Sequence, residues 1–122
     1  RQMIRSKVLL KDAVTQWGNV AGLVSGLFLN DIDLVGRSMK DVLIEPTRSI
    51  LIPGFETMRA LAMENGAVGF GISGSGPSVF ALAKDEKTAR KITDAQQKHL
   101  TKLNINSNAY VSSVNAEGPR VL

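Results

Sequence analysis

Hydrophobic residues recur every three to four positions from Leu10 to Phe28, which is the spacing of one face of an α-helix. The stripe consists of Leu10, Ala13, Val14, Trp17, Val20, Ala21, Val24, Leu27 and Phe28. Trp17 lies in the middle of the stripe, so we expect its side chain to be part of the core. Asn30 and Asp31 follow, and these residue types predict the end of this helix and a cap for the next.

Three further helices are predicted from the same spacing. They lie near residues 32–42, between Gly54 and Asn65, and over residues 86–103. The basic side chains of the last helix lie largely away from its apolar face, so we expect them to be exposed to solvent. His99 lies at the edge of that face, where we expect a partly covered, hydrogen-bonded side chain rather than a catalytic base.

The pattern changes from helical spacing to alternation after Gly66. Apolar residues alternate with glycines over residues 68–72, and residues 79–83 form a second apolar run. Both segments are predicted to be strands. A weaker third strand is expected over residues 108–114.

Strands interspersed with helices predict an α+β fold, namely a two-layer sandwich in which helices cover an antiparallel sheet. The 122 residues, 43% of them hydrophobic, suffice for a single domain over residues 1–122. Three strands are few for this many helices, and we expect a further strand upstream of Arg1. We therefore interpret the chain as part of a longer protein.

Composition excludes several classes of protein. With no Cys and one His, the chain lacks a disulfide framework, a thiol nucleophile and the ligands of a zinc finger. A net charge of +4 and an aromatic content of 5% do not indicate nucleic-acid binding. No apolar run approaches the roughly 20 residues that cross a bilayer. We expect a soluble, cytoplasmic protein that binds neither nucleic acid nor a membrane.

Two nucleotide-binding motifs are matched in spacing but not in context. Gly69, Gly71 and Gly74 have the spacing of a dinucleotide fingerprint, but Pro77 and a predicted strand follow where that motif needs a helix. Pro77 also follows Gly76 at the position where a P-loop carries its phosphate-binding Lys. We predict neither kind of nucleotide loop, and we assign no catalytic residue and no metal ligand to this chain.

The sequence GISGSGPS, residues 71–78, joins the two predicted strands and carries three Gly, three Ser and one Pro. Glycines allow the backbone to adopt positive φ and to approach a ligand closely, and consecutive N–H groups can bind an anion. The composition is compatible both with a ligand-binding loop and with an ordinary glycine-rich turn.

The sequence Glu45-Pro46-Thr47-Arg48 places a stiff turn between two charges. An Arg held by such a turn can bind a carboxylate through two parallel hydrogen bonds. The alternative is a surface ion pair between Arg48 and Glu45, which is favoured when these residues are considered alone.

In combination, the motifs resemble the C-terminal half of the homoserine kinases, a branch of the GHMP small-molecule kinase superfamily. The resemblance runs over nearly the whole chain and rests on RQMI, LKDAV, GLVSGLF, GRSMKDVLIEPTR, LIPGF, GAVGFGISGSGPSVFAL and AEGPRVL. EPTR, LIPGF and ISGSGPS in this order are specific to the homoserine branch. The resemblance implies a GHMP kinase C-terminal domain of the ferredoxin-like type. It also implies an enzyme that transfers the γ-phosphoryl group of ATP to L-homoserine, giving O-phospho-L-homoserine for threonine biosynthesis.

The resemblance implies roles for particular residues. Arg48 is expected to bind the carboxylate of the substrate, Gly74 to line the substrate pocket, and Arg1 to contact the substrate as well. Three more residues of the glycine-rich loop are expected near the site: Ser73, Ser75 and Gly76. ATP and Mg²⁺ are expected to bind mainly to an N-terminal half that this chain lacks, so that the chain alone is inactive. The family also implies a homodimer.

Two other functions remain open at this stage. A free-standing α+β module that binds or senses a small ligand would use the same loop and the same Arg without kinase activity. A basic RNA-binding sandwich would use the lysines of the last helix, and its affinity would fall steeply with salt.

Overall fold

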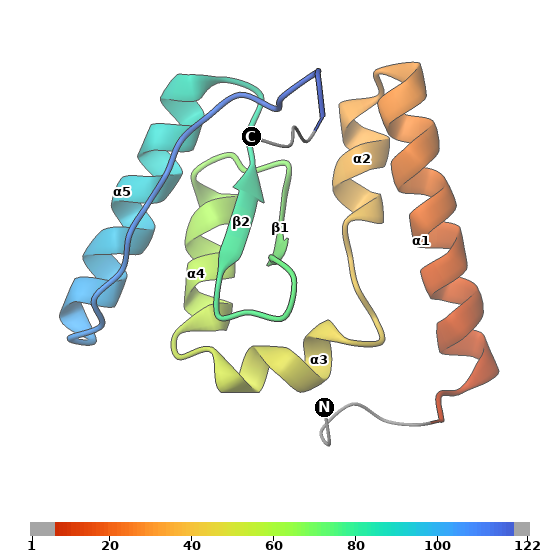
Figure 1. Ribbon diagram of the computed structural model, residues 1–122, viewed down its shortest axis with the longest axis horizontal. Coiled ribbons are helices and arrows are strands. Elements are labelled where there is room, and N and C mark those ends of the chain that lie inside the picture. Colours follow the sequence, from red (N-terminus) through yellow and green to blue (C-terminus); the bar gives the residue numbers. More distant parts are fainter. Residues whose placement is uncertain (1–6, 119–122) are drawn as a thin grey trace.

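The computed structural model describes residues 7–118. Its elements in chain order are α1 (Leu10–Leu29), α2 (Ile32–Ser38), α3 (Glu45–Arg48), the short 3₁₀ turn η1 (Ser49–Leu51), α4 (Phe55–Glu64), β1 (Gly69–Ile72), β2 (Val79–Leu82) and α5 (Glu86–Lys102). Helices α4 and α5 lie on one side of the β1–β2 hairpin, α1 and α2 lie on the other, and α3 lies at the bottom (Figure 1). The predicted α+β fold is confirmed.

The core lies between one face of the hairpin and helices α4 and α5. The strands are antiparallel, with Phe70 opposite Ala81 and Ile72 opposite Val79, so these four side chains share a face. Phe70 packs on Phe55 of α4 with ring centroids 5.3 Å apart. The buried cluster consists of Ile52, Phe55, Met58, Ala62, Ala67, Phe70 and Ile92. The alternating pattern therefore directs its large side chains to this side.

The opposite face of β1 carries glycines, which let the chain between α2 and α3 approach closely. A Cβ at Gly69 would overlap the side chain of Met39, and one at Gly71 would lie 3.7 Å from a carboxylate oxygen of Glu45. Helix α2 ends at Ser38 rather than at the expected residue 42. The chain leaves the helix there and continues along this face.

Helix α1 packs on α2 through small residues. A Cβ at Gly26 would lie 2.9 Å from both the backbone nitrogen and a methyl group of Val35, so the two helices are as close as a glycine allows. Two polar side chains of α1 hold the segment after α2: Gln16 accepts from the N–H of Val42 at 2.9 Å, and Asn19 donates to the carbonyl of Lys40 at 2.7 Å. Helix α1 thus packs Gly22 and Gly26 against α2 and holds the connection that leads to α3.

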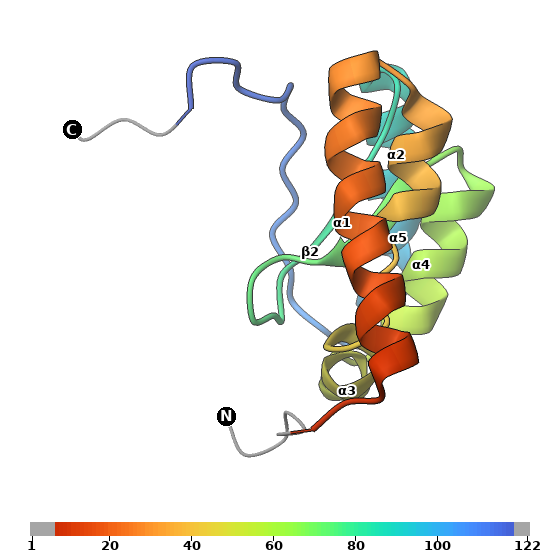
Figure 2. The same ribbon diagram turned by 90° about the vertical axis from the view of Figure 1, so that its right-hand side faces the viewer.

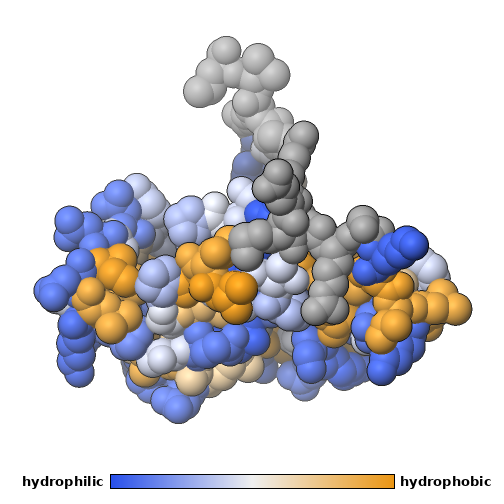
Figure 3. Space-filling model, turned by 90° about the horizontal axis from the view of Figure 1, so that it is seen from below, coloured by the Kyte–Doolittle hydropathy of each residue, from blue (hydrophilic) through white to orange (hydrophobic). Residues whose placement is uncertain are grey.

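The apolar stripe of α1 is exposed, and the prediction of a core Trp17 is wrong. Trp17 is 64% exposed and Phe28 is 88% exposed. The other large exposed side chains of the stripe are Leu10, Val14, Val20, Val24 and Leu27. Seen from below, hydrophobic side chains lie at the surface on the α1 side of the molecule (Figure 3). No described element covers this face, because α1 contacts α2 with its glycines instead.

The predicted helix boundaries are largely confirmed. Asn30 ends α1 with φ of 55°, and the side chain of Asp31 accepts from the N–H of Leu34 at the start of α2. Asp85 caps α5 in the same way through the N–H of Thr88. No helix within residues 7–118 combines the length and the apolar character that crossing a membrane requires.

Two local predictions are wrong. Residues 108–114 form no strand, and this segment runs apart from the helices (Figure 2). A strand needs a neighbour, and no described segment pairs with it. His99 is partly covered as expected, but its Nε2 atom is buried without a hydrogen-bond partner among residues 7–118. A Cβ at Gly54 would lie 2.8 Å from this atom, so the turn before α4 covers it.

Candidate functional site

The loop between β1 and β2 is closed by its own backbone. The N–H of Ser73 donates to the carbonyl of Ser78 at 2.8 Å, and the N–H of Gly76 donates to the carbonyl of Ser73 at 3.2 Å. Gly74 and Gly76 have φ of 62° and 74°, which glycine adopts without the strain that a Cβ causes. The Gly76–Pro77 peptide bond is cis. The glycines are therefore required by the backbone path of the loop.

Arg48 lies against this loop. Its Nη1 atom donates to the carbonyl of Ser75 at 2.7 Å, across 27 positions of sequence. The other N–H groups of its guanidinium have no hydrogen-bond partner among the described residues. A guanidinium fork with free donors suits a planar carboxylate. The two candidate elements of the sequence are thus in direct contact.

Arg48 is carried by a single helical turn, α3, where the sequence shows no clear period. Pro46 lies in the first turn, where its missing N–H costs no helical hydrogen bond. The carboxylate of Asp41 accepts from the N–H groups of Leu43, Ile44 and Glu45 at 2.8, 2.9 and 3.2 Å. These contacts satisfy backbone donors that a helix start leaves unpaired.

Glu45 does not pair with Arg48, which corrects the surface ion pair favoured from the residues alone. Its side chain is buried and accepts a short hydrogen bond from Arg59 of α4. The guanidinium of Arg59 also lies 4.8 Å from the ring centroid of Phe55. Burial raises the pKa of Glu45, while Arg59 acts in the opposite direction. The nearby carboxylates of Asp41 and Glu56 add to the rise.

The loop is supported on one side and open on the other. A Cβ at Gly76 would lie 3.1 Å from the Cδ1 atom of Ile52, so this end of the loop packs on the segment before α4. A Cβ at Gly74 would have no neighbour within 4 Å. The space beside Gly74 is therefore available to a ligand.

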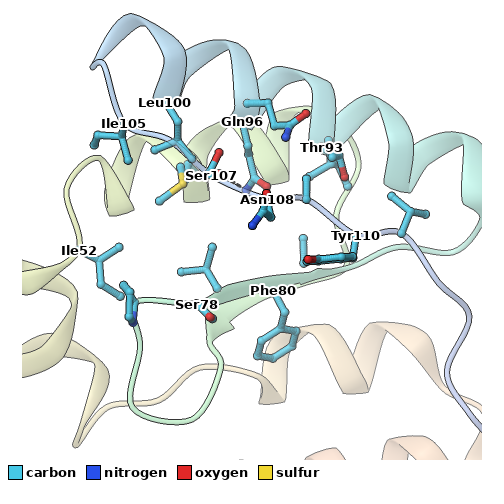
Figure 4. A pocket seen from close by; sticks show the side chains of 18 of the residues that line it. Ile52, Ser78, Phe80, Thr93, Gln96, Leu100, Ile105, Ser107, Asn108 and Tyr110 are labelled. Atoms are coloured by element: carbon cyan, nitrogen blue, oxygen red, sulfur yellow. Dashed lines mark hydrogen bonds between the residues drawn. The ribbon is translucent and has the colours of Figure 1, made fainter.

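A cavity of about 710 Å³ lies between β2, α5 and residues 105–112. Figure 4 shows Thr93, Gln96 and Leu100 of α5 along one side of it, with Ser107, Asn108 and Tyr110 on the segment that crosses it. Pro77 and Ser78 line the cavity, but Arg48 and residues 73–76 do not. The cavity thus reaches only the end of the loop, away from Arg48.

The described residues form neither a cluster of metal-ligating side chains nor a P-loop for ATP phosphates. No group of three or more His, Cys, Asp or Glu side chains within residues 7–118 is placed to hold a metal ion. The glycine-rich loop continues into Pro77 and β2, so no Lys and no helix follow it. We derive no reaction step through ATP or Mg²⁺ from this chain.

The structure brings together Arg48, Ser73, Gly74, Ser75 and Gly76. Arg1 lies outside the described residues. Sequence reasoning missed Asp41 and Arg59. An Asp shortly before a helical turn is a capping signal, which points to Asp41. No local pattern selects Arg59 as the partner of Glu45, because the pair joins two separate elements.

The segments that carry Arg48 and the glycine-rich loop also match known proteins. Residues 23–102 match the family model described as "GHMP kinases C terminal". The chain belongs to this family. The matched region contains Arg48 and the glycine-rich loop, and it ends with α5. Helices on a small antiparallel sheet are thus the fold of a GHMP kinase C-terminal domain.

Similar proteins carry the name homoserine kinase. A homoserine kinase of Chlorobium phaeovibrioides is 44% identical over 100% of this chain and 39% of its own length. One from Xylella fastidiosa is 37% identical over 100% of this chain and 38% of its own length. A crystal structure of homoserine kinase from Cytophaga hutchinsonii has a TM-score of 0.94 and 50% identity, covering 100% of this chain and 39% of that protein. The chain therefore spans well under half the length of these relatives.

Proposed function

We propose that this chain is the C-terminal domain of a homoserine kinase. Joined to an N-terminal domain, it would phosphorylate the hydroxyl of L-homoserine at the expense of ATP, giving O-phospho-L-homoserine for threonine biosynthesis. Relatives of that name match the entire chain. The observation that carries the proposal on this molecule is the contact between Arg48 and the carbonyl of Ser75, which joins the two candidate binding elements.

Arg48 and the loop would form one wall of the amino-acid site. Homoserine carries a carboxylate, an ammonium group and one reactive hydroxyl, so its site needs a fixed cation and a closely fitted surface. The bond to Ser75 orients the Arg48 guanidinium and leaves donors for the carboxylate. Gly74 has no neighbouring atoms within 4 Å of a built Cβ, which leaves room for the substrate beside the loop. The role of Arg1 stays a prediction.

The contribution of this chain to phosphoryl transfer would be positioning. Holding the hydroxyl at the correct distance and angle accounts for much of the catalysis of such reactions. We place ATP and Mg²⁺ mainly on the N-terminal domain, and we expect the 122-residue chain alone to be inactive.

The test is kinetic and uses the full-length protein with ATP and L-homoserine. We expect Arg48→Ala to raise the KM for homoserine about 10- to 100-fold, because a hydrogen bond to a charged group contributes roughly 1.5–3 kcal/mol. The KM for ATP should stay unchanged. Arg37→Ala is the control, since Arg37 is exposed in the last turn of α2. An unchanged KM for homoserine in Arg48→Ala would remove this residue from the site.

The N-terminal domain is proposed as a partner that also completes the sheet. The cavity separates β2 from residues 105–112, and residues 106–112 have no backbone hydrogen bond among the described residues. A strand from upstream of Arg1 would supply partners for both edges.

A cysteine pair tests this arrangement, because the chain contains no Cys. Ala81 and Ala109 lie on the two sides of the cavity. Strands on either side of an intervening strand are about 10 Å apart, beyond the roughly 7 Å limit for a disulfide. In the full-length protein, Ala81→Cys with Ala109→Cys should stay reduced, and the amides of residues 106–112 should exchange slowly. A disulfide that forms readily would show that the two segments pair directly.

The remaining expectations keep the status of predictions: a homodimer, a cytoplasmic location, and partners that include neither nucleic acid nor a membrane. A free-standing ligand-binding module is not favoured, because the relatives that match the whole chain are named homoserine kinases.

A further inference from the structure

Helix α3 is too short to hold Arg48 in place by itself. It has four residues, which is one helical turn. An isolated turn is unstable in water, because fixing its backbone costs more than its first hydrogen bond returns. The direction of the Arg48 side chain therefore depends on contacts that α3 makes with other elements.

One of these contacts is the ion pair between Glu45 and Arg59. Glu45 is the first residue of α3, three positions before Arg48, and its side chain is only 10% exposed. Arg59 comes from α4, where its guanidinium also contacts Glu56 at 3.6 Å and lies over the Phe55 ring. Because α4 contributes Phe55, Met58 and Ala62 to the buried cluster, Arg59 connects α3 to the core.

The same carboxylate lies beside the strand that leads into the glycine-rich loop. A Cβ at Gly71 would be 3.7 Å from Oε2 of Glu45, and the loop begins two residues later. One end of α3 is thus fixed under β1 by Glu45, and the other end reaches the loop through the bond from Arg48 to Ser75. The turn therefore contacts both the loop end of β1 and the loop itself.

We propose that Arg59 is a positioning residue, which acts through Glu45 to hold Arg48 against the glycine-rich loop in the geometry that receives the substrate carboxylate. The proposal rests on the function proposed above. Removal of Arg59 leaves the Glu45 carboxylate buried without its charged partner. The carboxylate then moves toward water and takes α3 with it, which displaces Arg48.

The experiment uses the full-length protein with Arg59→Met, which keeps an unbranched apolar side chain over Phe55. We expect the KM for homoserine to rise about 10- to 100-fold, the effect of a small displacement caused by a residue outside the reaction. The kcat and the KM for ATP should change little. Arg59→Lys keeps the charge and should restore part of the affinity. If Arg59→Met fails to fold, Arg59→Lys and Glu45→Gln replace it in the same assay.

The matched control is Arg90→Met. Arg90 also pairs with a Glu, namely Glu86 one turn earlier on α5, but both side chains are exposed and far from α3 in sequence. This variant should leave the KM for homoserine unchanged. An Arg59→Met variant that behaves like Arg90→Met would overturn the proposal.

A second arm separates positioning from general destabilisation. In an Arg48→Ala background, Arg59→Met should add nothing to the KM for homoserine, since the residue through which it acts is absent. A full additional increase in that background would refute the mechanism.

A readout without activity separates this proposal from the proposed function. Amide exchange of Ser73 and Gly76, whose N–H groups close the loop, should be faster in Arg59→Met than in Arg90→Met. If the full-length protein fails to phosphorylate homoserine, the proposed function is refuted and this readout still decides the positioning. Equal exchange rates in the two variants would overturn the role of Arg59.

Discussion

The two longest helices of the molecule use their apolar residues in different ways. Helix α5 is polar along most of its length, yet its Ile92 is 2% exposed and packs in the core. Helix α1 carries many more large apolar residues, and Trp17 and Phe28 among them are largely exposed. The difference shows that periodicity identifies the face of a helix that needs to be buried, whereas the tertiary structure decides which element buries it.

The reason lies in what each helix meets. Helix α5 packs on α4 and β2, and its Ile92 joins the buried cluster that contains Met58 of α4. Helix α1 meets α2, and that contact uses Gly26 against Val35. A contact between backbones excludes bulky side chains, so the apolar stripe is directed elsewhere.

The largest expected effect is the difference in stability between a substitution in the buried core and one in the exposed apolar stripe of α1. We expect Phe55→Ala to lower the free energy of unfolding by about 3–5 kcal/mol, because it removes a buried ring. Trp17→Ala in the 122-residue chain should change it by only about 0.5 kcal/mol, as at other exposed positions. Urea unfolding measures both. We expect Trp17→Ala to cost more in the full-length protein. Equal costs for the two variants in the short chain would mean that α1 is covered there.

A pair of glycines on α1 tests the close contact with α2. Gly26→Ala should destabilise the chain by about 1–3 kcal/mol, because its Cβ meets backbone as well as side-chain atoms of Val35. Gly18→Ala is the control: its Cβ would meet nothing within 4 Å, and it should stabilise the helix by about 0.5–1 kcal/mol. Thermal unfolding distinguishes the two. A neutral Gly26→Ala would show that the helices can separate without loss.

The Glu45 carboxylate should make the stability of the chain depend on pH. Burial raises the pKa of Glu45 above 4.5 in the folded chain, so protonation of this group favours folding. Its contribution is fully present below pH 4.5 and is lost as the pH rises through the raised pKa. The stability of the unsubstituted chain relative to Glu45→Gln should therefore fall between acidic and neutral pH. Arg59, Asp41 and Glu56 face the group in both chains, and a pH-independent difference would contradict the assignment.

The smallest effect is expected at the start of α5. Asp85→Ala removes the cap on the N–H of Thr88 and should lower the melting temperature slightly. The backbone and hydroxyl of Thr88 lower the pKa of Asp85 below 3.8. Its contribution is present above pH 3.8 and is lost as the pH falls through the lowered pKa. The two melting curves should therefore converge in acid, and a constant gap would show that the charge of Asp85 has no part in the cap.

Much of the fold follows from local patterns. The limits of α1 and α5, the cap at Asp31 and the two strands agree with the expectations, because each depends on residues close together in the sequence. The contact of Arg48 with the loop joins two motifs that the sequence marks as candidates. Their roles in binding stay predictions.

The remainder depends on contacts between distant segments. The partner of Glu45 proved to be Arg59 on α4, which no spacing rule selects. The exposure of Trp17 and the missing strand at residues 108–114 have a common cause, since both need neighbours that the described residues do not provide. A hydrophobic pattern indicates which side chains need to be buried but not which element buries them.

The bond between Arg48 and Ser75 ends on a main-chain oxygen. Every amino acid has the same main-chain carbonyl, so the hydrogen bond from Arg48 does not depend on which side chain stands at position 75. Substitutions there can alter the polarity or bulk at the rim of the loop while the arginine keeps its orientation. Position 75 is thus a place where the surface of the loop can change without loss of the hydrogen bond from Arg48.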